Sequence, residues 1–215
     1  MTEKEFKASL DRLEQAYHFT DGYHLRDGAP LEVGREYVFD GTPMMCVRGY
    51  HASRNVFDAL PYAPGATLSW VECREVTEER DDKLVCRRRR VIATIDATEL
   101  LRKFARLCAL DVIHLWDAPD VVVRYLKTGD ESIRDAAMAA AWDARSDANA
   151  AARSDANVAA RNAAKPDARI AARSAAWASA SAIGRDTSRQ GQRVRLDHMV
   201  NQAFNSQFYR EGMLD

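Results

Sequence analysis

The pattern of hydrophobic and polar positions predicts strands mainly in the first half of the chain. Residues 67–76 alternate between apolar and polar side chains, and residues 84–95 predict a second strand. The charged interval 77–83 lies between them, so the two runs predict an antiparallel hairpin joined by a turn or protruding loop. A shorter run at residues 36–39 predicts a further strand.

Three other segments carry apolar residues at helical spacing. Residues 2–18 begin with a capping box, and so does the segment that covers residues 96–108. A shorter helix is predicted over residues 121–126, ending at Gly129. We expect the helix at residues 96–108 to cover the sheet and the compact domain to close after Gly129. The pattern therefore predicts an α+β fold, with a small, mainly antiparallel sheet and covering helices in a head domain at residues 1–130.

The segment that follows the head domain is periodic. Alanine occupies every fourth position from Ala136 to Ala180, and fills 22 of these 45 positions. Alanine is the strongest helix former and the stretch contains no glycine, so this tetrapeptide repeat predicts a helix. The alanine ridge winds around the helix by roughly 40° per repeat, which allows another helix to cross closely. Pro166 should break the helix near Ala164.

These patterns predict a tail of two parts. An Ala-rich helical arm is expected at residues 131–184, kinked near Pro166, and an amphipathic helix at residues 185–215. Trp142 and Trp177 are the only aromatic residues in the repeat and could mark its docking points. The apolar face of the last helix needs a partner, which is either the head domain or a second copy of the chain.

Composition and charge narrow the class of protein. Of the 215 residues, 47% are hydrophobic and 29% are charged, as in ordinary globular proteins. No apolar run is long enough to span a membrane and no secretory signal is visible, so we expect a cytoplasmic protein. The formal charge of −1 hides an asymmetry, because residues 134–195 carry 11 Lys or Arg against 6 Asp. A basic tail and an acidic remainder favour association between domains or copies.

Two further sequence features have ordinary structural interpretations. Successive residues of the run Arg87–Arg90 should point to opposite faces of a strand, which favours cross-strand ion pairs with Glu72 and Glu75 over one continuous anion or nucleic-acid surface. The four cysteines lack a CxxC pair, which predicts reduced, buried thiols. They are Cys46, Cys73, Cys86 and Cys108.

The candidate site lies in residues 46–62. Gly49 precedes a point where a strand-like run turns into a short helix, which Ser53 could cap and Pro61 would end. Side chains at such a junction are held by two rigid elements while they face outward. His51 is therefore the candidate catalytic residue. The predicted binding residues of this junction are Arg48, Tyr50, His51, Asn55, Asp58 and Tyr62.

Each of these residues also has a structural interpretation. The ring nitrogens of His51 could bond to main-chain groups of the turn, and Asn55 and Asp58 could cap the short helix. Cys46 and His51 are five residues apart with no other ligand pair near in sequence, so no metal site is predicted. No cofactor is predicted either.

The core of this segment resembles a family of uncharacterised phage and prophage proteins. The resemblance rests on Cys46, Gly49, Tyr50, His51, Ala52, Asn55, Asp58 and Tyr62. It extends through residues 31–37 and 81–86, and covers about residues 25–100. A low-complexity repeat often follows this head in the family, as it does here. Ser53 departs from the family, because many members have Cys at that position. The resemblance implies a phage or prophage origin, in a host cell or with a virion, and no particular activity.

Three functions follow as expectations. The first is an interaction protein that self-associates, or binds a virion or host protein, through its helical arm. The alternative is a NAD-using enzyme, because the segment from Arg48 to His51 is similar to the histidine-bearing strand of ADP-ribosyltransferase-like enzymes; Glu72 and Glu75 would be candidates for its catalytic glutamate. The third is nucleic-acid binding by the basic tail, which interleaved Asp residues make less favourable.

Overall fold

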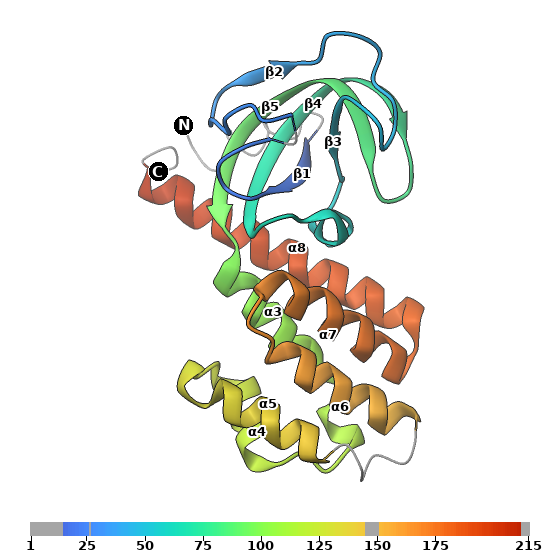
Figure 1. Cartoon of the computed structure of the whole chain (residues 1–215), viewed down its shortest axis with the longest axis vertical. Coiled ribbons are helices and arrows are strands. Elements are labelled where there is room, and N and C mark those ends of the chain that lie inside the picture. Colours follow the sequence, from blue (N-terminus) through green and yellow to red (C-terminus); the bar gives the residue numbers. More distant parts are fainter. Residues whose placement is uncertain (1–14, 26, 145–150, 212–215) are drawn as a thin grey trace. The chain divides into compact units, whose positions relative to one another are not determined.

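The computed structural model describes residues 15–25, 27–144 and 151–211, and the chain forms two compact units (Figure 1). The sheet unit comprises residues 1–97 and 197–215, and the helical unit comprises residues 98–196. The α+β class is as predicted from the sequence. The boundary differs from the expected one at residue 130, because the helices after residue 97 pack with the Ala-rich segment.

The sheet unit is built on one antiparallel sheet of five strands. Four of them follow the spatial order β1-β4-β5-β2, and β3 pairs with the other end of β5. The strands are β1 (Gln15–Thr20), β2 (Glu36–Val38), β3 (Tyr50–Ala52), β4 (Thr67–Glu79) and β5 (Leu84–Asp96). Strand β5 therefore lies at the centre of the unit and contacts three other strands.

The central hairpin β4–β5 confirms the strongest strand prediction. Its strands extend further than expected, because β4 continues through the polar residues 77–79. The turn is closed by a hydrogen bond of 2.8 Å from the Arg80 N–H to the Lys83 carbonyl. Polar side chains at the end of this hairpin stand on exposed strand rather than in a loop.

Strand β1 corrects the helix predicted over residues 2–18. Residues 1–14 lie outside the described part of the chain, but residues 15–18 belong to an antiparallel strand that pairs with β4. Tyr17 lies opposite Trp70, and their rings stack with centroids 6.5 Å apart. Cross-strand aromatic contacts of this kind stabilise a strand, and the helical spacing of the apolar residues did not indicate them.

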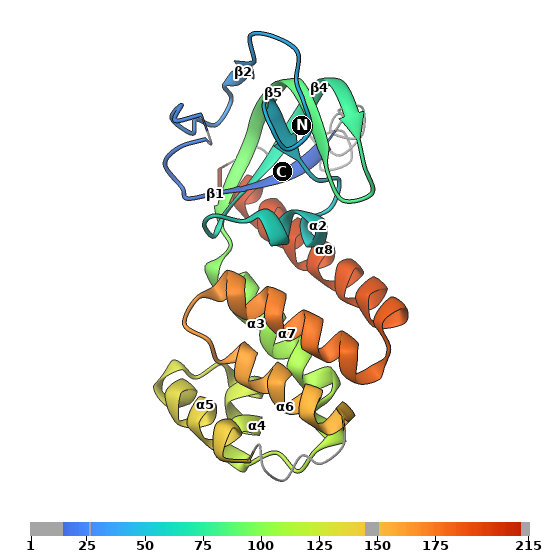
Figure 2. The same ribbon diagram turned by 45° about the vertical axis from the view of Figure 1, so that its right-hand side comes forward.

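Helix α8 (Arg185–Arg210) covers one face of the sheet with its C-terminal half (Figure 2). The ring of Trp70 lies 5.6 Å from that of Phe204 and 6.0 Å from that of Phe208. The predicted C-terminal amphipathic helix is therefore present, and its apolar face finds a partner within the chain. The sequence had suggested the helix at residues 96–108 for this role.

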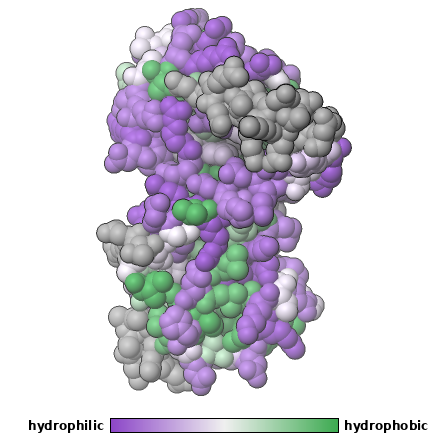
Figure 3. All heavy atoms as spheres, turned by 180° about the vertical axis from the view of Figure 1, so that it is seen from behind, coloured by the Kyte–Doolittle hydropathy of each residue, from purple (hydrophilic) through white to green (hydrophobic). Residues whose placement is uncertain are grey.

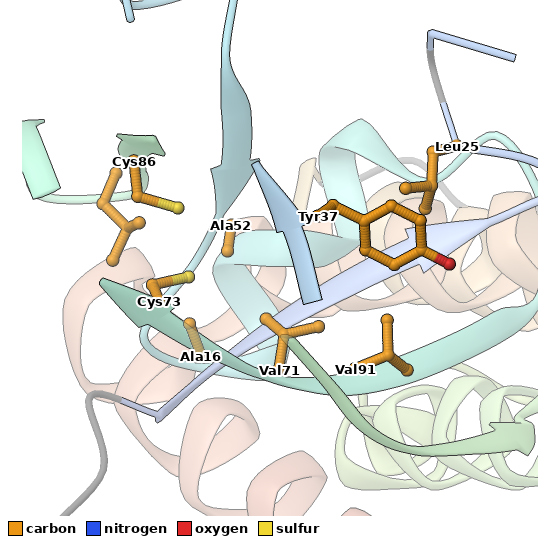
Figure 4. Close-up of a cluster of buried hydrophobic side chains, with 9 residues drawn as sticks. Ala16, Leu25, Tyr37, Ala52, Val71, Cys73, Cys86 and Val91 are labelled. Atoms are coloured by element: carbon orange, nitrogen blue, oxygen red, sulfur yellow. The ribbon is translucent and has the colours of Figure 1, made fainter. Parts of the chain in front are cut away.

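The other face of the sheet carries a small hydrophobic core (Figure 4). Its buried members are Ala16, Leu25, Tyr37, Ala52, Val71, Cys73, Leu84, Cys86 and Val91. A hydrogen bond between the side chains of Cys73 and Cys86, together with burial, raises the pKa of the Cys73 thiol. Cys73, Cys86 and Cys108 are free and buried as predicted, whereas Cys46 is exposed.

The short helix after β3 begins later than expected. Helix α2 (Val56–Ala59) has Asn55 as its N-cap, whose side chain accepts from the Asp58 N–H, and the 3₁₀ helix η1 (Leu60–Tyr62) follows directly. Ser53 is not the cap, because its hydroxyl donates to the Asp82 carbonyl at 2.7 Å. That bond ties the end of β3 to the hairpin turn.

The helical unit contains the elements that the sequence predicted after residue 97, together with one part of α8. A helix ends directly before Gly129, and another break surrounds Pro166, both as predicted. The elements are α3 (Thr98–Asp111), η2 (Ile113–Leu115), α4 (Asp120–Thr128), η3 (Glu131–Ile133), α5 (Arg134–Asp143), α6 (Ala151–Ala163) and α7 (Ala168–Ile183).

The alanine repeat forms helices that pack within the helical unit. Helices α6 and α7 pack against each other and against α3. Small side chains let helix axes approach closely, so this repeat supplies the interior of the unit. Its buried alanines include Ala156, Ala160, Ala164, Ala168, Ala172, Ala176 and Ala180, all members of the fourfold ridge. This part of the ridge is thus covered within the same chain.

Polar side chains add directional contacts to this alanine interior. The Asn157 amide donates to the Ala141 carbonyl at 2.7 Å, and the Gln192 amide donates to the Ser179 hydroxyl at 2.7 Å. The Arg161 guanidinium lies 3.4 Å from the centroid of the Trp142 ring. Such contacts specify one arrangement among helices whose alanine faces alone would permit several.

The surface differs between the two units. The face in Figure 3 is mainly hydrophilic over the sheet unit, whereas hydrophobic residues reach the surface over the helical unit. Among the described residues, none of the helices combines the length and the apolar character that crossing a bilayer requires.

Candidate anion-binding cavity

A cavity of about 740 Å³ opens in the sheet unit. Its walls come from β1, β3, β5 and the loops around residues 21–27 and 46–49. A volume of this size is typical of sites that enclose a small molecule. Much of the lining is apolar, including Leu25, Phe39 and Val47.

Arg89 is the central polar group of this cavity. It is only 2% exposed, and its Nη1 donates to the main-chain carbonyl of His51 at 2.9 Å. Its Nε–H is buried without an acceptor, and no ion pair joins Arg89 to a carboxylate in the described part of the chain. A buried guanidinium keeps its charge, so an uncompensated positive charge lies in the wall of the cavity.

The position of Arg89 follows from the register of the sheet. Arg89 lies opposite Cys73 of β4 and Tyr37 of β2, and both of these residues belong to the hydrophobic core. Alternation along β5 turns Arg89 toward that core, while Arg88 and Arg90 point to the other face. Burial is the main cause that lowers the pKa of Arg89, and the nearby thiols and Asp27 act in the opposite direction.

Tyr50 connects Arg89 to the nearest carboxylate of the cavity. The Arg89 guanidinium lies 5.0 Å from the centroid of the Tyr50 ring, a cation–π contact. The Tyr50 hydroxyl donates to Asp27 Oδ2 at 3.2 Å. Burial and the charge of Asp27 raise the pKa of Tyr50. Asp27 therefore binds the tyrosine rather than neutralising the arginine directly.

His18 also lines the cavity, from strand β1. Burial, followed by the charges of Arg89 and His51, holds the pKa of His18 well below its usual value of 6.5. None of the hydrogen bonds among the described residues involves its ring. His18 is thus a neutral imidazole in the same cavity as a cation that has no carboxylate partner among the described residues, and no pattern in the sequence indicated this role.

His51 has the geometry of a structural histidine. Its Nε2 accepts from the Cys46 N–H at 2.8 Å, and its Nδ1 lies 3.1 Å from the Gly49 carbonyl, to which it donates in the matching tautomer. Both nitrogens thereby hold the loop that leads into β3. Neither is left to contact a ribose, as the NAD-using alternative requires. Glu72 and Glu75, the candidate glutamates, do not line the cavity.

Other predicted binding residues lie at the rim. Arg48 lines the cavity and donates from Nε to the Thr42 carbonyl at 3.0 Å. The Tyr62 hydroxyl donates to Asp82 and accepts from Lys83 Nζ at 3.0 Å. The bond to Tyr62 is the main cause that raises the pKa of Lys83. Tyr50, Arg48 and Tyr62 therefore share one cavity with His51.

Asn55 and Asp58 do not line the cavity. The Asn55 amide donates to Asp58 Oδ2 at 2.8 Å, in addition to capping helix α2. Asp58 is 8% exposed. These two residues stabilise the turn after β3, which matches their structural interpretation.

The arginine run separates into two roles. Arg87 and Arg88 form ion pairs with Glu75 at 3.5 and 3.8 Å, which confirms cross-strand pairing on the solvated part of the sheet. Glu72 pairs instead with Arg74 of its own strand at 2.6 Å. Arg89 is the inward member of the run. The sequence predicted that successive arginines of the run point to opposite faces, but it did not indicate the cavity that Arg89 lines.

The sheet and cavity define an α+β domain with an internal cation, and a comparison with protein families covers the same region. Residues 16–103 match DUF7666, a domain of unknown function. No curated protein and no solved structure matches the chain. No group of three or more His, Cys, Asp or Glu side chains in the described ranges could hold a metal ion.

Proposed function

We propose that the sheet unit is a binding domain for a small molecule that carries an anionic group. The main support for this proposal is Arg89. Its buried positive charge has no carboxylate partner among the described residues and lies in the cavity wall. An isolated buried charge costs several kcal/mol of folding free energy. A bound anion would neutralise this charge and remove that cost, and the free energy gained would contribute to the affinity for the anion.

The composition of the cavity supports this class of ligand. Three lining residues carry permanent positive charge and two carry negative charge, a balance of +1 with the histidines neutral: Arg48, Lys83 and Arg89 against Asp21 and Asp27. Asp21 is occupied by the N–H groups of Tyr23 and His24, each at 2.9 Å. The apolar part of the lining favours a ligand with a hydrophobic body.

A thermal-shift panel of small carboxylates, sulfates and phosphates tests this proposal. The full chain should melt at a higher temperature with at least one ligand class, because a ligand that binds only the folded state stabilises it. Arg89→Met should abolish the shift. Arg90→Met is the matched control, since Arg90 is exposed on the opposite face and donates to the Gly34 carbonyl. An unchanged shift in Arg89→Met would refute the proposal.

We propose protein–protein interaction as a second function, carried by the helical unit. Helix α7 exposes Ile170 by 40% and Trp177 by 62%, two large apolar side chains two turns apart on one face. A phage or prophage origin belongs to this proposal and rests on the resemblance. Light scattering after size exclusion should detect an oligomer that Trp177→Ser dissociates, and a monomeric wild-type protein would remove the self-association form.

A further inference from the structure

The chemical class of the anion can be inferred from the two basic groups in the cavity wall. His18 on β1 and Arg89 on β5 lie on strands that flank β4, and both line the cavity. The charge of Arg89 is one of the causes that lower the pKa of His18, after burial. A ligand group seated between them would therefore meet one permanent cation and one imidazole that can become a cation.

His18 is free to respond to a ligand. In the described part of the chain its ring has no hydrogen-bond partner, and it lies on β1 directly opposite Ser69, whose hydroxyl is itself buried without a partner. The charged groups that act on it are Arg89 from β5 and His51 from β3. Both disfavour the imidazolium ion, so His18 is neutral in the ligand-free domain.

The two carboxylates that line the cavity accept hydrogen bonds from groups other than His18 and Arg89. Asp21 accepts from two main-chain N–H groups of its own loop. Asp27 accepts from the Tyr50 hydroxyl and from the Ala29 N–H at 3.2 Å. Neither carboxylate is hydrogen-bonded to His18 or Arg89. The negative charge that would compensate both basic groups must therefore come from outside the described residues.

We propose that the cavity takes a small-molecule phosphate monoester as its dianion, held by Arg89 and by His18, which gains a proton as the ligand binds. This inference rests on the anion binding proposed above. A carboxylate or sulfate monoanion would neutralise Arg89 alone, whereas a phosphate monoester offers a second charge; it also has one terminal acceptor oxygen more than a carboxylate. The cavity of about 740 Å³ leaves room for the apolar body beyond the phosphate.

The proton balance is simple. The second pKa of a phosphate monoester is about 6, so most of the ligand is already a dianion at pH 7. Binding then places two negative charges beside His18, which raises its pKa, and one proton moves from solvent to a ring nitrogen. When the ligand arrives as the monoanion, its own proton makes that transfer. No bond of the ligand breaks in either case.

Titration calorimetry of the full chain with phenyl phosphate and phenyl sulfate tests this inference. Phenyl sulfate has nearly the same shape but keeps a single charge. At pH 7 we expect phenyl phosphate to bind about tenfold more tightly, as befits one additional charged hydrogen bond. Repeating the titration in two buffers of different ionisation enthalpy should show proton uptake that approaches one per phenyl phosphate. This measurement needs no variant.

Variants then assign the proton. His18→Asn should bind both probes about equally, without proton uptake, whereas His114→Asn, an exposed histidine of the helical unit, should match the wild type. Equal affinities and no uptake in the wild-type protein would overturn the phosphate assignment and leave anion binding at Arg89 intact. Failure of both probes to bind at millimolar concentration would overturn both proposals.

Discussion

The guanidinium of Arg89 donates to the main-chain carbonyl of His51 at 2.9 Å. This bond links the inward arginine of the central strand β5 to the segment 46–62, in which the sequence predicts a site. His51 in turn uses both ring nitrogens to hold its own loop. The relationship explains why His51 lies at the cavity without being its reactive group: it fixes the main chain to which Arg89 is anchored.

Replacing Arg89 should separate stability from binding. Arg89→Met removes a buried charge that has no carboxylate partner in the described residues, and methionine fills much of the same space. We expect the free energy of unfolding of the ligand-free variant to equal that of the wild type or to exceed it by up to about 3 kcal/mol. Urea denaturation checks this, with Arg90→Met as the control. A large loss of stability would show that Arg89 is a structural residue.

His51→Ala should weaken the fold. The variant leaves the Cys46 N–H and the Gly49 carbonyl without the partners they have at 2.8 and 3.1 Å. The loss of one exposed and one partly buried hydrogen bond should lower the free energy of unfolding by about 1 to 2 kcal/mol. Urea denaturation measures the change, and His114→Ala, at an exposed position, should have little effect. Unchanged stability would contradict the structural role.

Gly49→Ala should be more damaging than an equivalent change elsewhere. Gly49 has φ +93°, and an added Cβ would lie 2.7 Å from the Pro43 Cβ and 3.1 Å from the Val85 Cγ2. Strain and overlap together should cost more than the roughly 1 to 2 kcal/mol of backbone strain alone. Gly34→Ala is the control, since its φ is +86° but no atom lies within 4 Å. Equal melting temperatures would contradict the packing at Gly49.

The ligand-free domain should lose stability in mild acid through His18. Its folded-state pKa lies well below 6.5, whereas in the unfolded chain it is close to that value. Below about pH 6.5 the unfolded state therefore binds more protons, and the free energy of unfolding falls as pH falls, by at most about 1.4 kcal/mol per pH unit for one group. Denaturation between pH 7.5 and 5 should show a smaller decrease in His18→Asn. An identical decrease in that variant would exclude His18 as the cause.

The alanine ridge should tolerate large side chains only where it is exposed. Ala172→Leu inserts three carbons into a fully buried contact of α7, and overpacking of this kind costs about 1 to 3 kcal/mol. Ala136→Leu makes the same change on the exposed side of α5 and should be nearly neutral. Circular dichroism during thermal unfolding compares the two. Equal melting temperatures would contradict the burial of the repeat.

Local patterns predicted much of the fold. The β4–β5 hairpin, the end of α4 before Gly129 and the break at Pro166 depend on neighbouring residues, and all three are present. The strand β1 was missed because its stability comes from pairing with β4, more than 45 residues away in the chain. The alanine ridge was recognised, but its partner helix α3 had been assigned to the sheet.

The candidate site was predicted only in part. The segment around His51 contributes to the lining of the proposed cavity, as a strand that ends at a turn presents its side chains at an edge. Arg89 was visible as one of four arginines, yet its burial depends on the register of β5 against β2 and β4. His18 lies in the segment predicted as helix, and no local pattern could place it beside Arg89.

The most direct test of the central claim is the ¹H–¹⁵N spectrum of the arginine Nε–H groups, recorded while phenyl phosphate is added. The Nε–H of Arg89 is buried without a partner in the described part of the chain and should give a distinct signal that is absent in Arg89→Met. We expect that signal to shift as the cavity fills, while the signals of surface arginines such as Arg90 stay in place. An Arg89 signal that does not move at saturating ligand would contradict anion binding in the sheet unit.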